Sequence, residues 1–268
     1  MLEAKNLEEI SRYIDEFCAV KDRSARIKIN NQDLEWQYGV LDDVKRPAAS
    51  LMKIVLAISV ENRIKDNSLD SKRVIAVKDL VNSKSNPSIL NSFDSEHLIS
   101  IIELVQLCLS ISDSFATSYL AQLLTTDELL DTLRVIGTQN SYLEIKSNLG
   151  SNTINGTTSA KDALKILEFG SSTSNYPITA SGLKNSVLNS RIPIGIKDFG
   201  TGLSHKTGTL LSVAHDVAII QCQQGFIALA FLTENQNDTL QTGYEMGMCT
   251  KRIIETIGFT PLSSRSYD

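Results

Sequence analysis

The chain has 268 residues, 42% of them hydrophobic, which is enough to bury a sizeable core in one large domain or two small ones. Its net charge is −5, and the sequence contains no dense cluster of basic residues. This balance is not typical of nucleic-acid binders, so we expect no nucleic-acid partner. No internal repeat or low-complexity tract is visible.

The first ten residues are polar and acidic and lack the apolar centre of a signal peptide. The sequence as written therefore predicts a cytoplasmic protein, or a periplasmic or secreted one if a leader has been removed. No apolar run reaches the length of a membrane span. Four scattered cysteines show no C-x-x-C spacing, which predicts buried free thiols, leaves one disulfide open and indicates no metal site. The cysteines are Cys18, Cys108, Cys222 and Cys249.

In chain order, residues 3–20 predict an amphipathic helix and residues 25–40 two short strands joined at Asn30-Asn31. An apolar run after Ser50 predicts a buried helix that begins near this serine, with Pro47 at its entry. Residues 138–156 are polar and without apolar periodicity, which predicts a long functional loop. The other elements of the middle region are predicted to be helices, over 98–109, from 115, over 127–136, from 157 and over 180–188.

Beyond residue 202 the pattern changes to period two, which predicts consecutive strands over 203–211, 213–221 and 226–233 and a final helix over 239–257. Strands at both ends with helices between them predict an α/β (α+β) fold. We expect an antiparallel sheet built from both termini, flanked by helices, with an inserted all-helical domain. The sheet lobe would comprise residues 1–42 and 200–268 and the helical lobe residues 43–199, with the active site at their junction.

Three short motifs occur in one order along the chain. Ser50-x-x-Lys53 starts the buried helix, and residues three apart on a helix are neighbours, so the lysine amine can reach the serine hydroxyl. Ser112-Asp113-Ser114 lies between two predicted helices, and Lys206-Thr207-Gly208-Thr209 opens a predicted strand. Each motif alone is weak, since a second S-x-x-K occurs elsewhere in the chain, but the ordered set is specific.

With these motifs the chain resembles the class A serine β-lactamases and the related penicillin-binding enzymes, whose signature is S-x-x-K, then S-D-N, then K-T-G. The resemblance extends to Thr157-Thr158 and to Val213-Ala214-His215-Asp216, and covers about residues 3–257. It implies the two-lobe β-lactamase-like fold and acyl transfer through a covalent serine ester. No cofactor and no metal are implied, and we expect a monomer acting on a small molecule, either a β-lactam or an acyl-peptide or ester with a carboxylate.

By this resemblance Ser50 is the nucleophile and Lys53 is its base, neutral because of burial and the nearby Lys206. Ser112 would lie between the two lysines and pass a proton to the leaving nitrogen. The backbone amides of Ser50 and Thr209 would form the oxyanion hole. The substrate carboxylate would be bound at Lys206 to Thr209, including the hydroxyls of Thr207 and Thr209 and the intervening Gly208.

In class A enzymes, the base that hydrolyses the acyl-enzyme is the glutamate of an E-x-x-x-N element in a long loop before Thr-Thr. Glu144-Ile145-Lys146-Ser147-Asn148 has this spacing. The resemblance therefore implies that Glu144 activates the hydrolytic water and that Asn148 helps to hold it, which would make the chain a β-lactamase.

The chain departs from the family at Ser114, which replaces the asparagine that would contact the acylamino side chain of the substrate. No arginine follows Lys206 on the strands, and Arg191 is a candidate substitute. One alternative is a DD-peptidase or esterase on the same scaffold, in which Glu144 has no catalytic role. A second alternative is a binding protein without turnover. A Ser-His-Asp hydrolase is disfavoured because no G-x-S-x-G elbow occurs.

Overall fold

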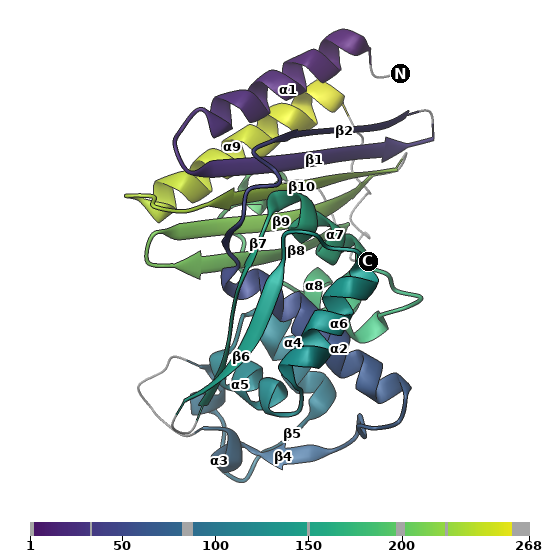
Figure 1. Cartoon of the computed structure of the whole chain (residues 1–268), viewed down its shortest axis with the longest axis vertical. Coiled ribbons are helices and arrows are strands. Elements are labelled where there is room, and N and C mark those ends of the chain that lie inside the picture. The colour runs from purple at the N-terminus through teal and green to yellow at the C-terminus, as the bar shows by residue number, and fades with distance from the viewer. Residues whose placement is uncertain are drawn as a thin grey trace, which may run out of the picture.

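A five-stranded antiparallel sheet is built from the two ends of the chain (Figure 1). Apolar residues alternate along the N-terminal pair, while the C-terminal strands are apolar on both faces because both are covered. The register pairs Ile27 with Leu229 in the middle of the sheet. In spatial order the strands are β2 (Leu34–Val40), β1 (Arg23–Asn31), β10 (Gly225–Thr233), β9 (Val213–Cys222) and β8 (Leu203–Leu210).

This computed structural model describes residues 3–32, 34–81, 88–148, 151–196, 202–222 and 225–258, apart from the side chains of residues 148 and 151. The predicted fold class and the sheet from both termini are confirmed. The predicted strands 203–211, 213–221 and 226–233 correspond to β8, β9 and β10, and all four cysteines are buried and unpaired. None of the helices within the described ranges is long and apolar enough to cross a membrane.

Two helices from opposite ends of the chain cover one face of the sheet (Figure 1). They are α1 (Ala4–Cys18) and α9 (Thr239–Ile257), which match the predicted helices 3–20 and 239–257. Their apolar side chains, such as Ile14 and Met246, pack with sheet residues including Phe231 in one buried cluster. Burying such surfaces is the main stabilising term for a two-layer arrangement of this kind.

The other face of the sheet packs on the middle of the chain, so a single apolar cluster includes sheet residues such as Val217 and the buried helix after Ser50. Because this cluster crosses the predicted boundaries, the division into lobes at residues 42/43 and 199/200 stays a prediction. The helices of this region are α2 (Lys53–Lys65), α3 (Val77–Leu80), α4 (Ile101–Ser110), α5 (Ser114–Gln122), α6 (Thr126–Ile136), α7 (Ala160–Gly170) and α8 (Pro177–Lys184). The described part of this region also contains the 3₁₀ turns η1 (Ala49–Met52), η2 (Ile89–Ser92) and η3 (Ile192–Ile196).

The middle region is not all-helical, contrary to prediction. Within residues 138–156, which were predicted as a long loop, the described part contains two paired antiparallel strands, β6 (Tyr142–Asn148) and β7 (Ser151–Thr158), called the hairpin below. The hairpin joins β3 (Arg46–Pro47) in a three-stranded sheet, and β4 (Val74–Ala76) pairs with β5 (Leu98–Ser100) in a second small sheet. Leu143 and Ile145 alternate with polar residues and pack on the apolar cluster, which stabilises one face of the hairpin.

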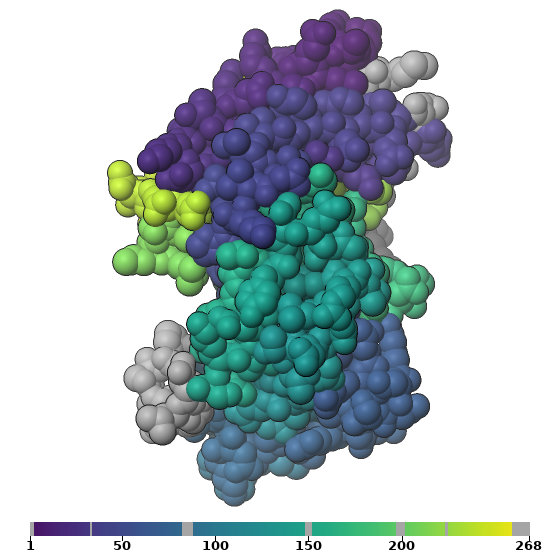
Figure 2. All heavy atoms as spheres, in the orientation of Figure 1, coloured from purple at the N-terminus to yellow at the C-terminus, as the bar shows by residue number. Residues whose placement is uncertain are grey.

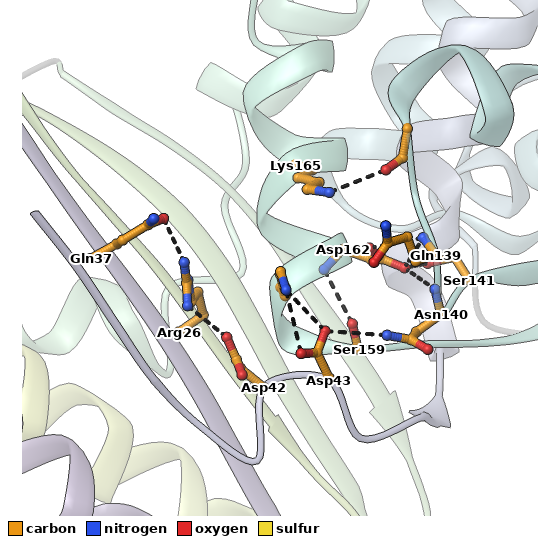
Figure 3. Close-up of polar contacts among 12 residues, drawn as sticks. Arg26, Gln37, Asp42, Asp43, Gln139, Asn140, Ser141, Ser159, Asp162 and Lys165 are labelled. Carbon is orange, nitrogen blue, oxygen red and sulfur yellow. Dashed lines mark hydrogen bonds and ion pairs between the residues drawn. The ribbon is translucent and has the colours of Figure 1, made fainter. Parts of the chain in front are cut away.

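The base of the hairpin is anchored by a buried carboxylate, Asp162 on α7 (Figure 3). Asp162 accepts hydrogen bonds from the backbone amides of Gln139 (3.0 Å) and Asn140 (2.6 Å) and from the Ser141 hydroxyl (3.0 Å). A second carboxylate, Asp43, accepts from the Asn140 side chain at 3.3 Å. These bonds satisfy backbone donors that a free loop would leave to water, so they fix where the hairpin begins.

Candidate active site

The predicted nucleophile, Ser50, lies on the 3₁₀ turn η1, and the α-helix begins three residues later at Lys53 rather than at the serine. Ala49 has a left-handed φ of +48°, an unfavourable conformation for a residue with a Cβ atom and one that often marks functional turns. Helix α2 is buried from Ile54 to Val60, which fixes Lys53 at its first turn. Ser50 and Lys53 both line a pocket of about 450 Å³.

Ser112 lies between Lys53 and Lys206, the two lysines of the predicted site. Its hydroxyl accepts a hydrogen bond from the Lys53 amine at 3.0 Å and from the Lys206 amine at 3.1 Å. Lys53 also donates to the Ser112 carbonyl at 2.6 Å. Ser112 has a left-handed φ of +61°, and Asp113 caps the helix that follows by accepting from the Ala116 amide at 3.0 Å. The turn between α4 and α5 thus directs one hydroxyl toward both amines.

The two amines alter each other's protonation. Lys206 is fully buried, and its pKa is lowered to about 7, first by burial and second by the positive charge of Lys53. Burial also lowers the pKa of Lys53. Removing an ammonium group from water is costly, and two such groups near one hydroxyl repel each other, so one proton is readily lost from the pair. This supplies an amine that can act as a base near neutral pH.

Strand β8 carries the third motif, of which Thr209 is the residue that lines the pocket. Lys206 Nζ donates to the Thr207 carbonyl at 3.1 Å, the Thr207 side chain is buried, and Thr209 lines the pocket. A side chain at Gly208 would come within 3.2 Å of Ala49, so glycine allows β8 to approach the turn that carries Ser50.

Arg191 is hydrogen bonded to strand β8. Its guanidinium donates to the Thr209 hydroxyl at 2.6 Å, to the Gly208 carbonyl at 2.8 Å and to the His215 carbonyl. Arg191 is buried, and burial lowers its pKa. The sequence named it as a candidate for carboxylate binding. In the structure its bonds orient the hydroxyl of Thr209.

The structure does not bring Glu144 into this group. Glu144 lies on β6, and its carboxylate forms an ion pair with Lys146 at 2.9 Å. The strand that lines the pocket is β7, through residues 152–156, and β6 pairs with it. Glu144 therefore belongs to the neighbouring strand rather than to the pocket wall. The side chain of Asn148, its predicted helper, lies outside the described residues.

The pocket is lined mainly by hydroxyl, amide and apolar groups. Ser114, which stands at the asparagine position of the family motif, belongs to this lining together with Thr117. Among the residues that the structure describes, no carboxylate lines the pocket, and no group of three or more His, Cys, Asp and Glu could hold a metal ion. The arrangement can activate a serine and protonate a leaving group. The described lining holds no acidic residue that could activate a second nucleophile.

The fold and its matches agree on one family. The model of the beta-lactamase enzyme family matches residues 8–254, whereas no curated protein matches. A beta-lactamase from Sphaerobacter thermophilus has 21% identity and a TM-score of 0.79, covering 95% of this chain and 99% of its own. A structure named PBP-A has 18% identity and a TM-score of 0.72, covering 95% and 96%. A mutant of PBP-A, described as an acyl-enzyme complex with penicillin G, has 18% identity and a TM-score of 0.71, also covering 95% and 96%. The family model matches nearly the whole chain, and the chain shares the fold of these solved structures. The chain therefore belongs to the beta-lactamase enzyme family.

Proposed function

We propose that this protein is a serine acyl-transfer enzyme of the penicillin-binding type, which forms a Ser50 ester quickly and hydrolyses it slowly. Its substrates would be β-lactams and acyl-peptides or esters of similar shape. The observation that carries the proposal is the Ser112 hydroxyl, hydrogen bonded to both Lys53 and Lys206, at a pocket whose described lining holds Ser50 but no carboxylate.

Acylation uses groups that the pocket supplies. Ser50 Oγ bonds to the carbonyl carbon of the substrate and gives its proton to the amine of Lys53, in the protonation state of the pair in which Lys53 is neutral and Lys206 is charged. The tetrahedral oxyanion is stabilised by backbone amides, which we assign to Ser50 and Thr209 by the family resemblance. The bond between carbon and nitrogen then breaks, and the leaving nitrogen receives the Ser112 proton, which Lys53 replaces. Lys206 and the Thr209 hydroxyl bind the carboxylate of the substrate.

Deacylation needs a base that removes a proton from water. Glu144 was the candidate, but its ion pair with Lys146 and its place on β6 support the reading in which it has no catalytic role. The acyl-enzyme would then be lost slowly, with the lysine pair as the nearest base. This favours the peptidase-like alternative over an efficient β-lactamase.

The proposal is tested by incubating the protein with penicillin G and measuring its intact mass over time. We expect one equivalent of covalent adduct, mapped to the peptide that carries Ser50, and no adduct in Ser50→Ala. Fast lactam turnover without a detectable adduct would support the β-lactamase alternative, and a lack of both would support the non-catalytic one.

A further inference from the structure

Asp216 is a buried carboxylate that has no part in the proposed reaction. It lies on β9, directly opposite Thr207 of β8, and is fully buried. Successive side chains of a strand lie on opposite faces, so Thr207 and Thr209 share the face of Asp216, whereas Lys206 lies on the other face. Burying a charge is costly unless the charge is paired and hydrogen bonded, so the partners of Asp216 indicate what it holds in place.

Asp216 connects the main sheet to residues 189–192, the segment that leads into η3. Its Oδ2 accepts a hydrogen bond from the Ile192 amide at 3.0 Å, and its Oδ1 lies 3.2 Å from His205 Nδ1. A carboxylate oxygen only accepts, so His205 Nδ1 is the donor. The other ring nitrogen of His205 is hydrogen bonded to the Asn189 side chain at 3.2 Å. Both ends of the segment are therefore linked to Asp216, one directly and one through His205.

The middle of this segment carries Arg191, whose guanidinium extends to strand β8. It donates to the Thr209 hydroxyl at 2.6 Å and to the Gly208 carbonyl at 2.8 Å. Burial lowers the pKa of Arg191, and the negative charge of Asp216 opposes this effect. Asp216 thus supplies Arg191 with both a fixed backbone and a compensating charge.

Helix α9 packs closely against the same segment at two of its glycines. A Cβ atom at Gly243 would come within 3.0 Å of Arg191 Cγ, and one at Gly247 within 2.9 Å of the Arg191 carbonyl oxygen. This packing restrains the backbone but supplies no charge. Substitution of Asp216 should therefore alter the orientation and charge balance of the guanidinium more than the fold.

We propose that Asp216 is a positioning residue, which acts through Arg191 to keep the Thr209 hydroxyl directed toward the carboxylate of the substrate. His205 takes part because it links Asp216 to the start of the segment. The consequence is selectivity for an anionic substrate, with the chemistry at Ser50 unchanged. This inference rests on the proposed function, because it names a determinant of the substrate class at the same site.

The test compares two acyl thioesters that differ only in the anion, one of mercaptoacetate and one of mercaptoacetamide. Release of the thiol gives kcat/KM for each, and the ratio of the two values is the preference for the carboxylate. Asp216→Ala should lower this ratio about 10-fold, the effect of weakening one hydrogen bond to a charged group, while kcat/KM for the amide stays within about twofold. Asp216→Asn keeps an acceptor for the Ile192 amide but loses the charge, so the ratio should fall about threefold.

Glu61→Gln is the matched control for Asp216→Asn. Glu61 is also a buried carboxylate that accepts from two backbone amides, but those amides begin helix α8. Its ratio should equal that of the unaltered protein. A merely structural role would lower kcat/KM for both thioesters alike and leave the ratio unchanged.

The inference would be overturned by an unchanged ratio in the Asp216 variants, by an equal loss in Glu61→Gln, or by an unaltered protein that does not distinguish the two thioesters. If Asp216→Ala does not fold, Asp216→Asn decides alone. A protein that takes up penicillin G at Ser50 but shows one of these results refutes only this inference, whereas absence of any Ser50 adduct refutes the proposed function.

Discussion

The Ser112 hydroxyl has two lone pairs and one proton. When Lys53 and Lys206 both donate to it, at 3.0 and 3.1 Å, its own proton remains available to a third group. A substrate nitrogen that leaves Ser50 is such a group. The left-handed backbone conformation of Ser112 is energetically unfavourable. It is maintained where the Ser112 hydroxyl forms hydrogen bonds with both lysine amines.

Replacing Ser112 by alanine should therefore lower the rate of Ser50 acylation about 10²- to 10⁴-fold, the usual contribution of a positioned proton donor. Stopped-flow measurement with a chromogenic lactam gives this rate. Ser112→Gly is the control for backbone strain, because glycine adopts positive φ freely. If the glycine variant were as active as the unaltered protein, the hydroxyl would have no role in proton transfer.

Acylation should also depend on pH through the lysine pair. The pKa of Lys206 is lowered to about 7, and protonation below that value leaves both amines charged and no base. The kcat/KM for acylation should therefore rise as the pH increases through about 7, with the apparent pKa belonging to the pair rather than to one residue. Lys206→Met removes one of the two charges, so the apparent pKa of Lys53 should move upward. A profile unchanged by this substitution would exclude coupling between the lysines.

At the scale of elements, the sequence was sufficient wherever apolar periodicity was strong. Helix α9 and strands β8 to β10 follow their patterns closely. The hairpin β6–β7 was missed because its polar composition and two glycines outweighed a short alternation of Leu143 and Ile145. Its stability depends on contacts with α7 and the apolar cluster, which are remote in sequence. Figure 2 shows the corresponding teal part of the chain at the surface in the middle of the molecule.

The missed hairpin also changes the structural setting of Glu144, whose catalytic role stays a prediction. The E-x-x-x-N spacing was read as part of a loop that enters the pocket, but a strand alternates its side chains between two faces. Leu143 and Ile145 occupy the face that packs on the apolar cluster, so Glu144 takes the other. The order of the three motifs, in contrast, was enough to anticipate that Lys53, Ser112 and Lys206 would meet.

Helix α8 begins on a buried carboxylate. Glu61 of α2 is 2% exposed and accepts from the amides of Ile178 (3.0 Å) and Thr179 (2.9 Å) and from the Thr179 hydroxyl (2.7 Å). Glu61→Ala should lower the free energy of unfolding by about 3 kcal/mol, because these donors lose a charged acceptor. Glu61→Gln keeps one acceptor oxygen and should cost less. Urea denaturation compares the two, and equal losses would show that charge and hydrogen bonding are unimportant here.

At the scale of the whole molecule, His215 connects the main sheet to the strand that leads to Ser50. Its Nε2 donates to the Pro47 carbonyl at 2.7 Å, and its Nδ1 accepts from the Thr233 amide at 3.0 Å. The bond from Thr233 requires the neutral ring, because a protonated Nδ1 cannot accept a hydrogen bond, whereas the bond to Pro47 can form in either state. Burial accordingly lowers the pKa of His215 to about 4, below its ordinary value of 6.5.

The free energy of unfolding should therefore depend on pH through His215. Above pH 6.5 the ring is neutral in both states and its contribution is complete. As the pH falls from 6.5 to about 4, the unfolded chain binds the proton first, so up to about 3 kcal/mol of stability is lost. His215→Gln should be less stable at neutral pH but lose less on acidification. The same acid sensitivity in both proteins would assign it to another group.

We propose that Ser50 forms an ester that the pocket cannot hydrolyse efficiently. Its most direct test is a pulse of penicillin G followed by removal of free lactam, with the Ser50 adduct measured by intact mass in the unaltered protein and in Glu144→Gln. We expect a long-lived adduct that decays at the same slow rate in both proteins. Rapid decay in the unaltered protein together with a trapped adduct in Glu144→Gln would contradict it.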